Sequence, residues 1–267
     1  MRSVERPDIS YIVLPMTEAP DKFSVLSRRP ISAWPWPRII VGVPQERAMG
    51  HADEVFYSFW SIASQGVPII KIPYGRIDLT RNKMAIALLK TNFTHLLMLD
   101  IDHMHPSDIV QRLAGWVIAN PDIKVVGGMN FRRGEPYDPC CFLRGEDGGL
   151  YPPAAEWHEG LLKVDVIGTG SILIAKEVFE IIEPPWFFHN YDRVWEDEWP
   201  GEDISFSDLC TANGIDLYVD TTTTSPHMID AWVDEHTWAE YVKANPDMVV
   251  TREEFEKQNE KLARAKG

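Results

Sequence analysis

The chain has 267 residues, of which 45% are hydrophobic, enough apolar surface for one large domain or two small ones. Its formal net charge of -14 at pH 7 argues against a protein that binds long nucleic acids through their phosphate backbone, although it does not exclude such a partner. The three cysteines form neither a disulfide framework nor spaced zinc pairs, which indicates reduced thiols and a cytoplasmic location.

No segment of the sequence has the character of a membrane span or a secretory leader. The apolar runs are all too short to cross a bilayer, and the opening stretch MRSVERPDIS is too charged for a leader. We therefore expect a protein without a membrane span.

The first half of the chain alternates between strand-like and helix-like runs after a surface extension over residues 1–37, where prolines interrupt any regular helix. The expected strands cover residues 38–44, 67–74, 95–99 and 123–129, and the expected helices cover residues 51–65, 80–90 and a stretch from residue 106. Thr80 is the expected N-cap of the second helix. This alternation predicts a parallel sheet covered by helices.

The second half is less regular. Residues 130–160 are rich in Gly and Pro and form a connection long enough to indicate a functional lid. Residues 162–175 have strand character, interrupted at Gly168, Thr169 and Gly170. A helix from residue 202 to Gly214 and a strand over residues 215–220 are expected next, and a capping box at Thr251 predicts a peripheral helix over residues 251–265.

Two carboxylates follow the third expected strand. In HLLMLDIDHMHP, residues 95–106, the apolar run is typical of a strand buried on both faces, and it ends on Asp100 and Asp102. Ligands bind at the carboxyl ends of strands in open α/β sheets, and residues two apart on an extended chain point the same way. The pair is therefore a candidate site for Mg²⁺ or Mn²⁺, which prefer oxygen ligands. A solvated loop that caps a helix remains the alternative, and His103 and His105 are expected to cap or solvate this turn.

Further polar residues lie downstream. Glu202 and Asp203 begin an expected helix, where carboxylates are also favoured by the helix dipole alone. His227 follows the last expected strand, although a lone histidine is often only a well-packed residue.

Taken in order, these motifs resemble those of the GT-A glycosyltransferases, especially the family-2-like members. The resemblance covers residues 38 to about 230. Its motifs are VGVPQER after the first strand, DID at a strand end, GED at a late helix and SPH after the last core strand, together with RIDLTRNKMAIALL before the DID. It implies a Rossmann-like domain that uses a nucleotide-diphosphate sugar.

The resemblance also implies a role for each acidic residue and histidine. Asp102 and His227 would bind Mn²⁺ or Mg²⁺, and Asp100 would assist through the ribose or a metal-bound water. Asp203 would be the general base that activates the acceptor hydroxyl, with Glu202 beside it. This role for Asp203 presumes inversion of the sugar, which the sequence does not fix.

The implied donor site draws on three further segments. Its residues are Pro44, Gln45 and Arg47 near the nucleoside, Arg76, Arg81 and Asn82 near the diphosphate, and Gly168, Thr169 and Gly170 beside the sugar. Arg132 and Arg133, in the long loop, are also able to close on phosphate. For any one arginine, ordinary surface charge remains an alternative, as does a simple β-bulge for the glycine segment.

Three other functions remain open. A haloacid-dehalogenase-like phosphatase also carries two Asp residues two apart, and Asp203 and Asp208 would serve as its later metal ligands, but the residues around DIDHMH depart from its pattern. A nucleotidyltransferase would begin with a Gly-rich basic loop, which VGVPQERAMG lacks. A catalytically inactive nucleotide-sugar-binding scaffold would have no need for Asp100, Asp102, Asp203 and His227 together.

We therefore predict a single GT-A, Rossmann-like α/β domain over residues 38–230, with a mixed, mostly parallel sheet flanked by helices. An extension over residues 1–37 would precede it, and a helical extension over residues 231–267 would follow. The predicted activity is metal-dependent transfer of a sugar, with a UDP-sugar as the favoured donor, to a hydroxyl acceptor that the sequence does not identify. Residues 130–160 and 184–201 are expected to select that acceptor.

Overall fold

The fold is that of the computed structural model of the chain, which describes residues 30–45, 53–73, 75–145, 149–151, 159–190, 201–229, 232–246 and 257. Most of the predicted N-terminal extension, the tip of the Gly- and Pro-rich loop and all but residue 257 of the predicted helix over residues 251–265 lie outside this part of the chain.

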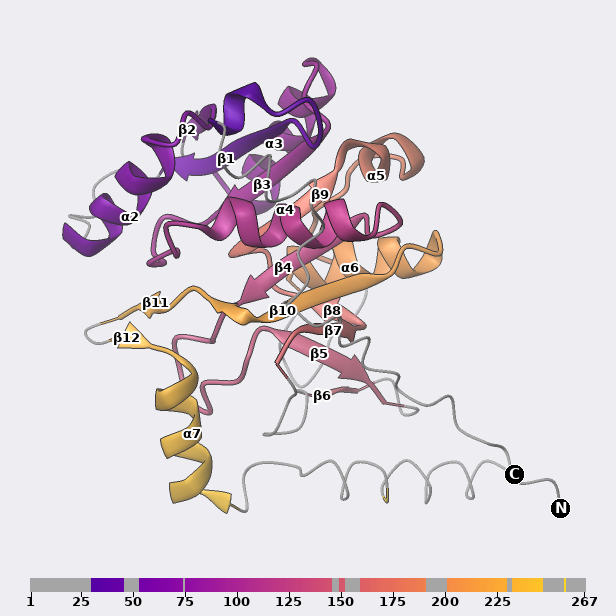
Figure 1. The fold of residues 1–267 in the computed structure, drawn as a ribbon. Coiled ribbons are helices and arrows are strands. Elements are labelled where there is room, and N and C mark those ends of the chain that lie inside the picture. The colour runs from indigo at the N-terminus through magenta and orange to yellow at the C-terminus, as the bar shows by residue number, and fades with distance from the viewer. Residues whose placement is uncertain are drawn as a thin grey trace, which may run out of the picture.

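A seven-stranded sheet forms the centre of the molecule, in the order β2-β1-β3-β9-β4-β10-β7 (Figure 1). Its strands are β1 (Ile39–Gln45), β2 (Ile69–Pro73), β3 (His95–Leu99), β4 (Val125–Met129), β7 (Leu161–Val164), β9 (Ser171–Ala175) and β10 (Leu217–Thr224). Strands β1, β2, β3, β4 and β10 run in one direction, and β7 and β9 run in the other. The predicted mixed, mostly parallel sheet, typical of a Rossmann-like fold, is confirmed.

Helices cover both faces of this sheet. They are α2 (Asp53–Ala63), α3 (Ile77–Leu89), α4 (Ile109–Ala119), α5 (Lys176–Ile181), α6 (Glu202–Ala212) and α7 (Glu235–Ala244), and a short 3₁₀ helix spans Ile31–Ala33. Among these described helices, none is both long enough and apolar enough to cross a membrane.

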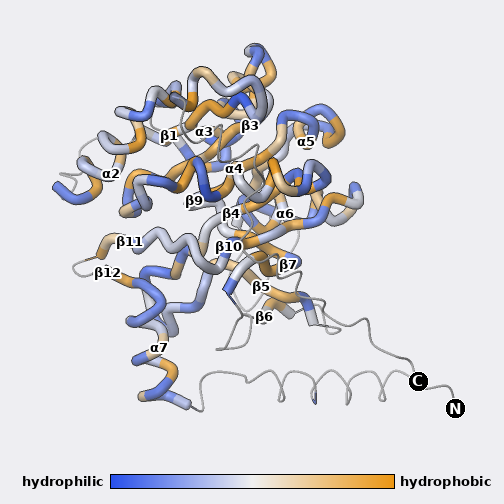
Figure 2. The backbone as a smooth tube through the Cα atoms, viewed as in Figure 1, coloured by the Kyte–Doolittle hydropathy of each residue, from blue (hydrophilic) through white to orange (hydrophobic). Residues whose placement is uncertain are grey.

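Strand β3 shows how the sequence pattern produces two cores. Leu96 and Met98 point to one face, where they pack in a cluster with residues of α3, α5 and α6, whereas Leu97 and Leu99 point to the other, with residues of α2 and α4. All four are buried completely because successive side chains of a strand alternate between faces. The apolar runs of such strands, β1 among them, are orange in Figure 2.

The structure corrects two local predictions and refines a third. Helix α3 begins at Ile77, because the Thr80 amide already donates to the carbonyl of Arg76, so Thr80 lies inside the helix rather than at its N-cap. The run over residues 162–175 has the predicted strand character and the predicted interruption at residues 168–170, but it contributes to three strands, β7, β8 (Val166–Ile167) and β9, because β8 pairs with β5 outside the central sheet. The loop over residues 130–160 contains β5 (Cys141–Arg144) and β6 (Leu150–Tyr151), which form a second sheet with β8.

A small hairpin and helix α7 complete the described fold. The hairpin pairs β11 (His227–Met228) with β12 (Trp232–Val233) and so crosses the predicted domain boundary at residue 230. Val233 and Trp238 belong to the same apolar cluster as α3 and α6. Residues on both sides of that boundary therefore share a core.

Candidate functional site

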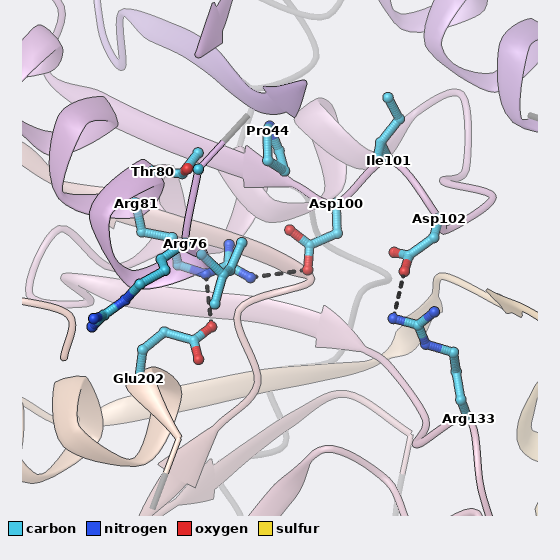
Figure 3. Close-up of a pocket in the computed structure, with 11 residues that line it drawn as sticks. Pro44, Arg76, Thr80, Arg81, Asp100, Ile101, Asp102, Arg133 and Glu202 are labelled. Carbon is cyan, nitrogen blue, oxygen red and sulfur yellow. Dashed lines mark hydrogen bonds and ion pairs between the residues drawn. The ribbon is translucent and has the colours of Figure 1, made fainter. Parts of the chain in front are cut away.

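A cavity of ≈ 450 Å³ opens at the carboxyl ends of β1 and β3, the edge at which open α/β sheets bind ligands. Its walls come from the ends of both strands, from the start of α3, from the segment after β4 and from the first residue of α6 (Figure 3). The residues that line it are Pro44, Gly75, Arg76, Ile77, Thr80, Arg81, Asp100, Ile101, Asp102, Arg133 and Glu202.

Arg81 joins two carboxylates from distant parts of the chain at the floor of this cavity. Its buried guanidinium donates to Asp100 Oδ2 at 2.9 Å, to Glu202 Oε1 at 3.1 Å and to the Thr169 carbonyl at 3.2 Å. Burial acts to lower the pKa of Arg81, but the charges of Asp100 and Glu202 outweigh it and raise the pKa above its ordinary value. Arg81 is therefore a fixed cation. The other oxygen of Asp100, Oδ1, is buried without a hydrogen-bond partner among the described residues.

Asp102 lies in a separate cluster. His103 Nδ1 is 3.0 Å from Asp102 Oδ1, and both His227 Nε2, at 3.3 Å, and Arg133 Nη2, at 3.0 Å, approach Asp102 Oδ2. Burial acts to raise the pKa of Asp102, but hydrogen bonds with His103 and His227 outweigh it and hold the pKa well below its ordinary value. The carboxylate of Asp102 is therefore charged.

The expectation that Asp100 and Asp102 point together at one cation is not met. The chain turns at Ile101 and Asp102, so the extended geometry that would align the two side chains ends with β3. Asp102 turns to the histidines. Asp100 turns to Arg81 instead, although both carboxylates line the cavity (Figure 3).

The Asp102 cluster has donors that suit a divalent cation. One ligand atom from each of Asp102, His103 and His227 lies within 4.8 Å of the others. His227 Nδ1 lies 2.8 Å from the carbonyl of Phe131, which can only accept, so Nδ1 carries a proton and Nε2 is the nitrogen left to face Asp102. A carboxylate with imidazole nitrogens fits Mn²⁺ better than Mg²⁺, which favours oxygen alone.

His103 and His105 are buried, so the expectation that they cap or solvate the turn is wrong. The ring of His103 stacks on that of His227, with centroids 4.0 Å apart. His105 lies within hydrogen-bond distance of Ser225 Oγ and of the Asp100 carbonyl, and burial lowers the pKa of His105 to about 3. Their position beside the DID motif was the only sequence signal for this packing.

Glu202 and Asp203 stand at the start of α6, but only Glu202 lines the cavity. Asp203 is half-buried, and its Oδ1 accepts a hydrogen bond from the amide of Ile204 at 2.8 Å. Burial, followed by the negative charge of Glu202, raises the pKa of Asp203 to about 6. A carboxylate with a pKa near working pH is suited to proton transfer.

Only some of the residues predicted to bind the donor line the cavity in the structure. Pro44 and Arg76 line the cavity. Gln45 ends β1, but its side chain and all of Arg47 lie outside what the structure describes. Asn82 does not line the cavity. Its side-chain Nδ2 donates hydrogen bonds to the carbonyls of Asp78 and Phe187, and its Oδ1 accepts one from the amide of Trp186. These bonds connect α3 to the segment that follows α5.

The glycine segment before β9 packs against the protein itself. A Cβ added at Gly170 would lie 3.1 Å from Cε1 of His103, and one at Gly168 would lie 2.6 Å from Cβ of Cys140. The Gly170 carbonyl accepts from the Asp100 amide at 2.8 Å. Gly168 therefore has no room for a side chain, and a side chain at Gly170 would press on the ring of His103, which local sequence did not reveal.

No family model and no curated protein matches the chain. Among solved structures, it is similar to A197 from STIV, with a TM-score of 0.54 and 17% identity over 74% of this chain and 91% of that one. UDP-glucose pyrophosphorylase is a second neighbour, with a TM-score of 0.39 and 9% identity over 79% and 80% of the two chains, too low to support an argument. The first likeness supports the fold, and the site is therefore interpreted from its own residues.

Proposed function

We propose that the protein is a metal-dependent glycosyltransferase that moves a sugar from a nucleotide-diphosphate sugar, with a UDP-sugar as the favoured donor, to an acceptor hydroxyl. The observation that carries this proposal is the pairing of Asp102 with His227 beside a cavity that Asp102, Arg76 and Arg133 line. Such a cavity combines ligands for a cation with positive charge for a diphosphate.

In this proposal, Asp102 and His227 hold Mn²⁺ or Mg²⁺, and Asp100 contributes its unpartnered oxygen to the ribose or to a metal-bound water. The bound cation supplies charge neutralisation for the departing diphosphate. Pro44 and Arg76 border the nucleoside and diphosphate. Arg81 keeps Asp100 in place rather than binding phosphate, because its guanidinium is already committed to protein acceptors.

Asp203 acts as the general base. It takes the proton from the acceptor hydroxyl while the hydroxyl oxygen forms a bond to the anomeric carbon. The bond from that carbon to the diphosphate oxygen breaks, and its electron pair leaves with the nucleoside diphosphate. The raised pKa of Asp203 supports this role because the carboxylate remains charged at neutral pH yet accepts a proton readily.

The alternatives have less support. A phosphatase of the kind considered above would gather Asp203 and Asp208 around the cation of Asp100 and Asp102, whereas Asp208 pairs with Arg144. An inactive scaffold would have no need to gather ligand atoms of Asp102, His103 and His227 within 4.8 Å of one another beside a cavity.

Calorimetric titration with a panel of nucleoside diphosphates and UDP-sugars, with and without Mn²⁺, tests the proposal. We expect Mn²⁺-dependent binding that is lost in Asp102→Ala and kept in Asp216→Ala, which removes an equal charge from a surface pair with Lys163. Turnover should then release a nucleoside diphosphate. Release of pyrophosphate from a nucleoside triphosphate and a sugar phosphate would instead identify a nucleotidyltransferase, and binding without metal would contradict the cation site.

A further inference from the structure

Arg133 pairs with Asp102, one of the candidate metal ligands, at a position where a bound cation would compete with it. Its Nη2 lies 3.0 Å from Asp102 Oδ2 (Figure 3). His227 Nε2 faces the same oxygen at 3.3 Å. A guanidinium is always protonated and cannot ligate a metal. Arg133 and a cation held by Asp102 and His227 therefore compete for one carboxylate oxygen.

Of the two partners, Arg133 is the one that is free to move. Asp102 is fixed because its carbonyl accepts from the Met228 amide at 2.8 Å, and only 16% of its side chain is exposed. The Arg133 side chain is 56% exposed, and the Arg132 amide donates to the Asp138 carbonyl at 2.9 Å, which closes the base of the loop independently of the Arg133 side chain. Arg133 can therefore release Asp102 without breaking the hydrogen bond that closes the loop.

Once released, Arg133 would remain at the rim of the cavity. Arginine pairs with phosphate oxygens in a two-point arrangement, and the fixed Arg81 is already committed to Asp100 and Glu202. Arg133 is thus a mobile cation beside the place expected for the diphosphate.

Resting on the proposed function, we propose that Arg133 is a displaceable counter-ion. In the absence of metal, the Arg133 side chain neutralises Asp102. When a divalent cation binds to the Asp102 carboxylate, the Arg133 side chain moves away and pairs with the diphosphate of the donor. Binding of the metal and binding of the nucleotide are then coupled through one side chain, since each favours the position of Arg133 that the other requires.

The coupling predicts opposite effects of one substitution on two ligands. In Arg133→Gln, Mn²⁺ alone should bind about threefold more tightly, because a competing exposed ion pair is gone. UDP at saturating Mn²⁺ should bind about tenfold more weakly, because a charged phosphate contact is lost. Free Mn²⁺ is measured by its electron paramagnetic resonance signal, and UDP binding by calorimetry.

Two variants serve as controls. Arg132→Gln removes the same charge from the same loop but has no ion pair with Asp102 among the described contacts, so it should leave the affinity for Mn²⁺ alone nearly unchanged. Arg133→Lys keeps the charge and should restore part of the competition. Thermal unfolding of all three variants checks that the fold is retained.

The outcomes separate this inference from the proposed function. Mn²⁺ binding that depends on Asp102 but is equal or weaker in Arg133→Gln would overturn the displacement and leave the metal site intact. Tighter Mn²⁺ binding without weaker UDP binding would overturn the transfer to phosphate. Absence of Mn²⁺ binding in wild type, Arg133→Gln and Arg133→Lys alike would refute both the metal site and the displacement.

Discussion

At the scale of single residues, Arg81 is the cation on which the geometry of the cavity depends. Its side chain is 3% exposed and holds Asp100 and Glu202. Arg81→Met would leave both carboxylates in a poorly solvated place without a counter-charge. We therefore expect the free energy of unfolding to fall by about 3 kcal/mol, the scale of breaking a buried ion pair, measured by urea denaturation at pH 7.5.

Two comparisons make this expectation specific. Arg81→Met combined with Glu202→Gln should recover part of the loss because one of the stranded charges is removed. Lys163→Met breaks a pair with Asp216 in which the two side chains are 49% and 52% exposed, and it should cost less than about 1 kcal/mol. An equal loss in the Lys163 and Arg81 variants would show that Arg81 is not the special cation.

The proposed base gives a second prediction at this scale. Asp203→Asn keeps an oxygen able to accept from the Ile204 amide, but it cannot take up the acceptor proton. We expect transfer to slow by at least about 100-fold while the affinity for UDP with Mn²⁺ is unchanged. In the wild type, the rate should rise as the pH passes about 6, because the raised pKa of Asp203 keeps the base protonated below that value. Full transfer by the variant would exclude Asp203 as the base.

At the scale of secondary structure, the contact between β3 and β9 determines the shape of the Asp102 cluster. Strand β9 pairs antiparallel with β3, and Gly170, just before it, lies against the ring of His103. Gly170→Ala would place a methyl group 3.1 Å from His103 Cε1, so the ring that contacts Asp102 must shift by a few tenths of an ångström. We expect a loss of about 1–3 kcal/mol in unfolding free energy and weaker Mn²⁺ binding, measured by thermal denaturation with and without the metal.

Gly134→Ala is the matched control for this substitution. Gly134 lies in the segment after β4, and an added Cβ there meets nothing within 4 Å. The same change of residue type should therefore have little effect on stability or on Mn²⁺ binding. If Gly170→Ala behaved like Gly134→Ala, the packing of His103 would not control the metal site.

The same strands show what the sequence reveals and what it conceals. The apolar run of β3 and the acidic residues at its end were readable, because burial on both faces leaves a continuous hydrophobic pattern. The insertion of β9 between β3 and β4 was not, because it depends on pairing between segments that are distant along the chain. The sequence did not predict that Asp100 and Asp102 would point to different partners, for a related reason. Their separation follows from a turn after β3 and from side chains that α3 and the segments around β4 and β11 supply.

At the scale of the whole molecule, the buried ionisable groups give stability a pH dependence of mixed sign. His95, at the start of β3, is 4% exposed, and burial lowers the pKa of His95 to about 4. Between that value and the ordinary pKa of histidine, the unfolded chain binds the proton and the folded chain does not. The stability due to neutral His95 is therefore present above pH 6.5 and lost as the pH falls toward 4. Asp203 has the opposite sign, because a raised carboxyl pKa makes the folded state lose stability as the pH rises from about 4 to 6.

Comparison with variants isolates each group, since the remaining acids and histidines titrate alike in wild type and variant. For His95→Gln, the destabilisation relative to wild type should shrink by about 2 kcal/mol between pH 7.5 and pH 5, because only the wild type loses stability through this ring. For Asp203→Asn, the stability gained relative to wild type should instead grow with rising pH, because only the wild type must ionise the half-buried carboxyl at this position. Urea denaturation at four pH values measures both differences. A difference for His95→Gln that is constant with pH would show that the ring titrates equally in the folded and unfolded chain, and that its burial at the start of β3 has no electrostatic cost.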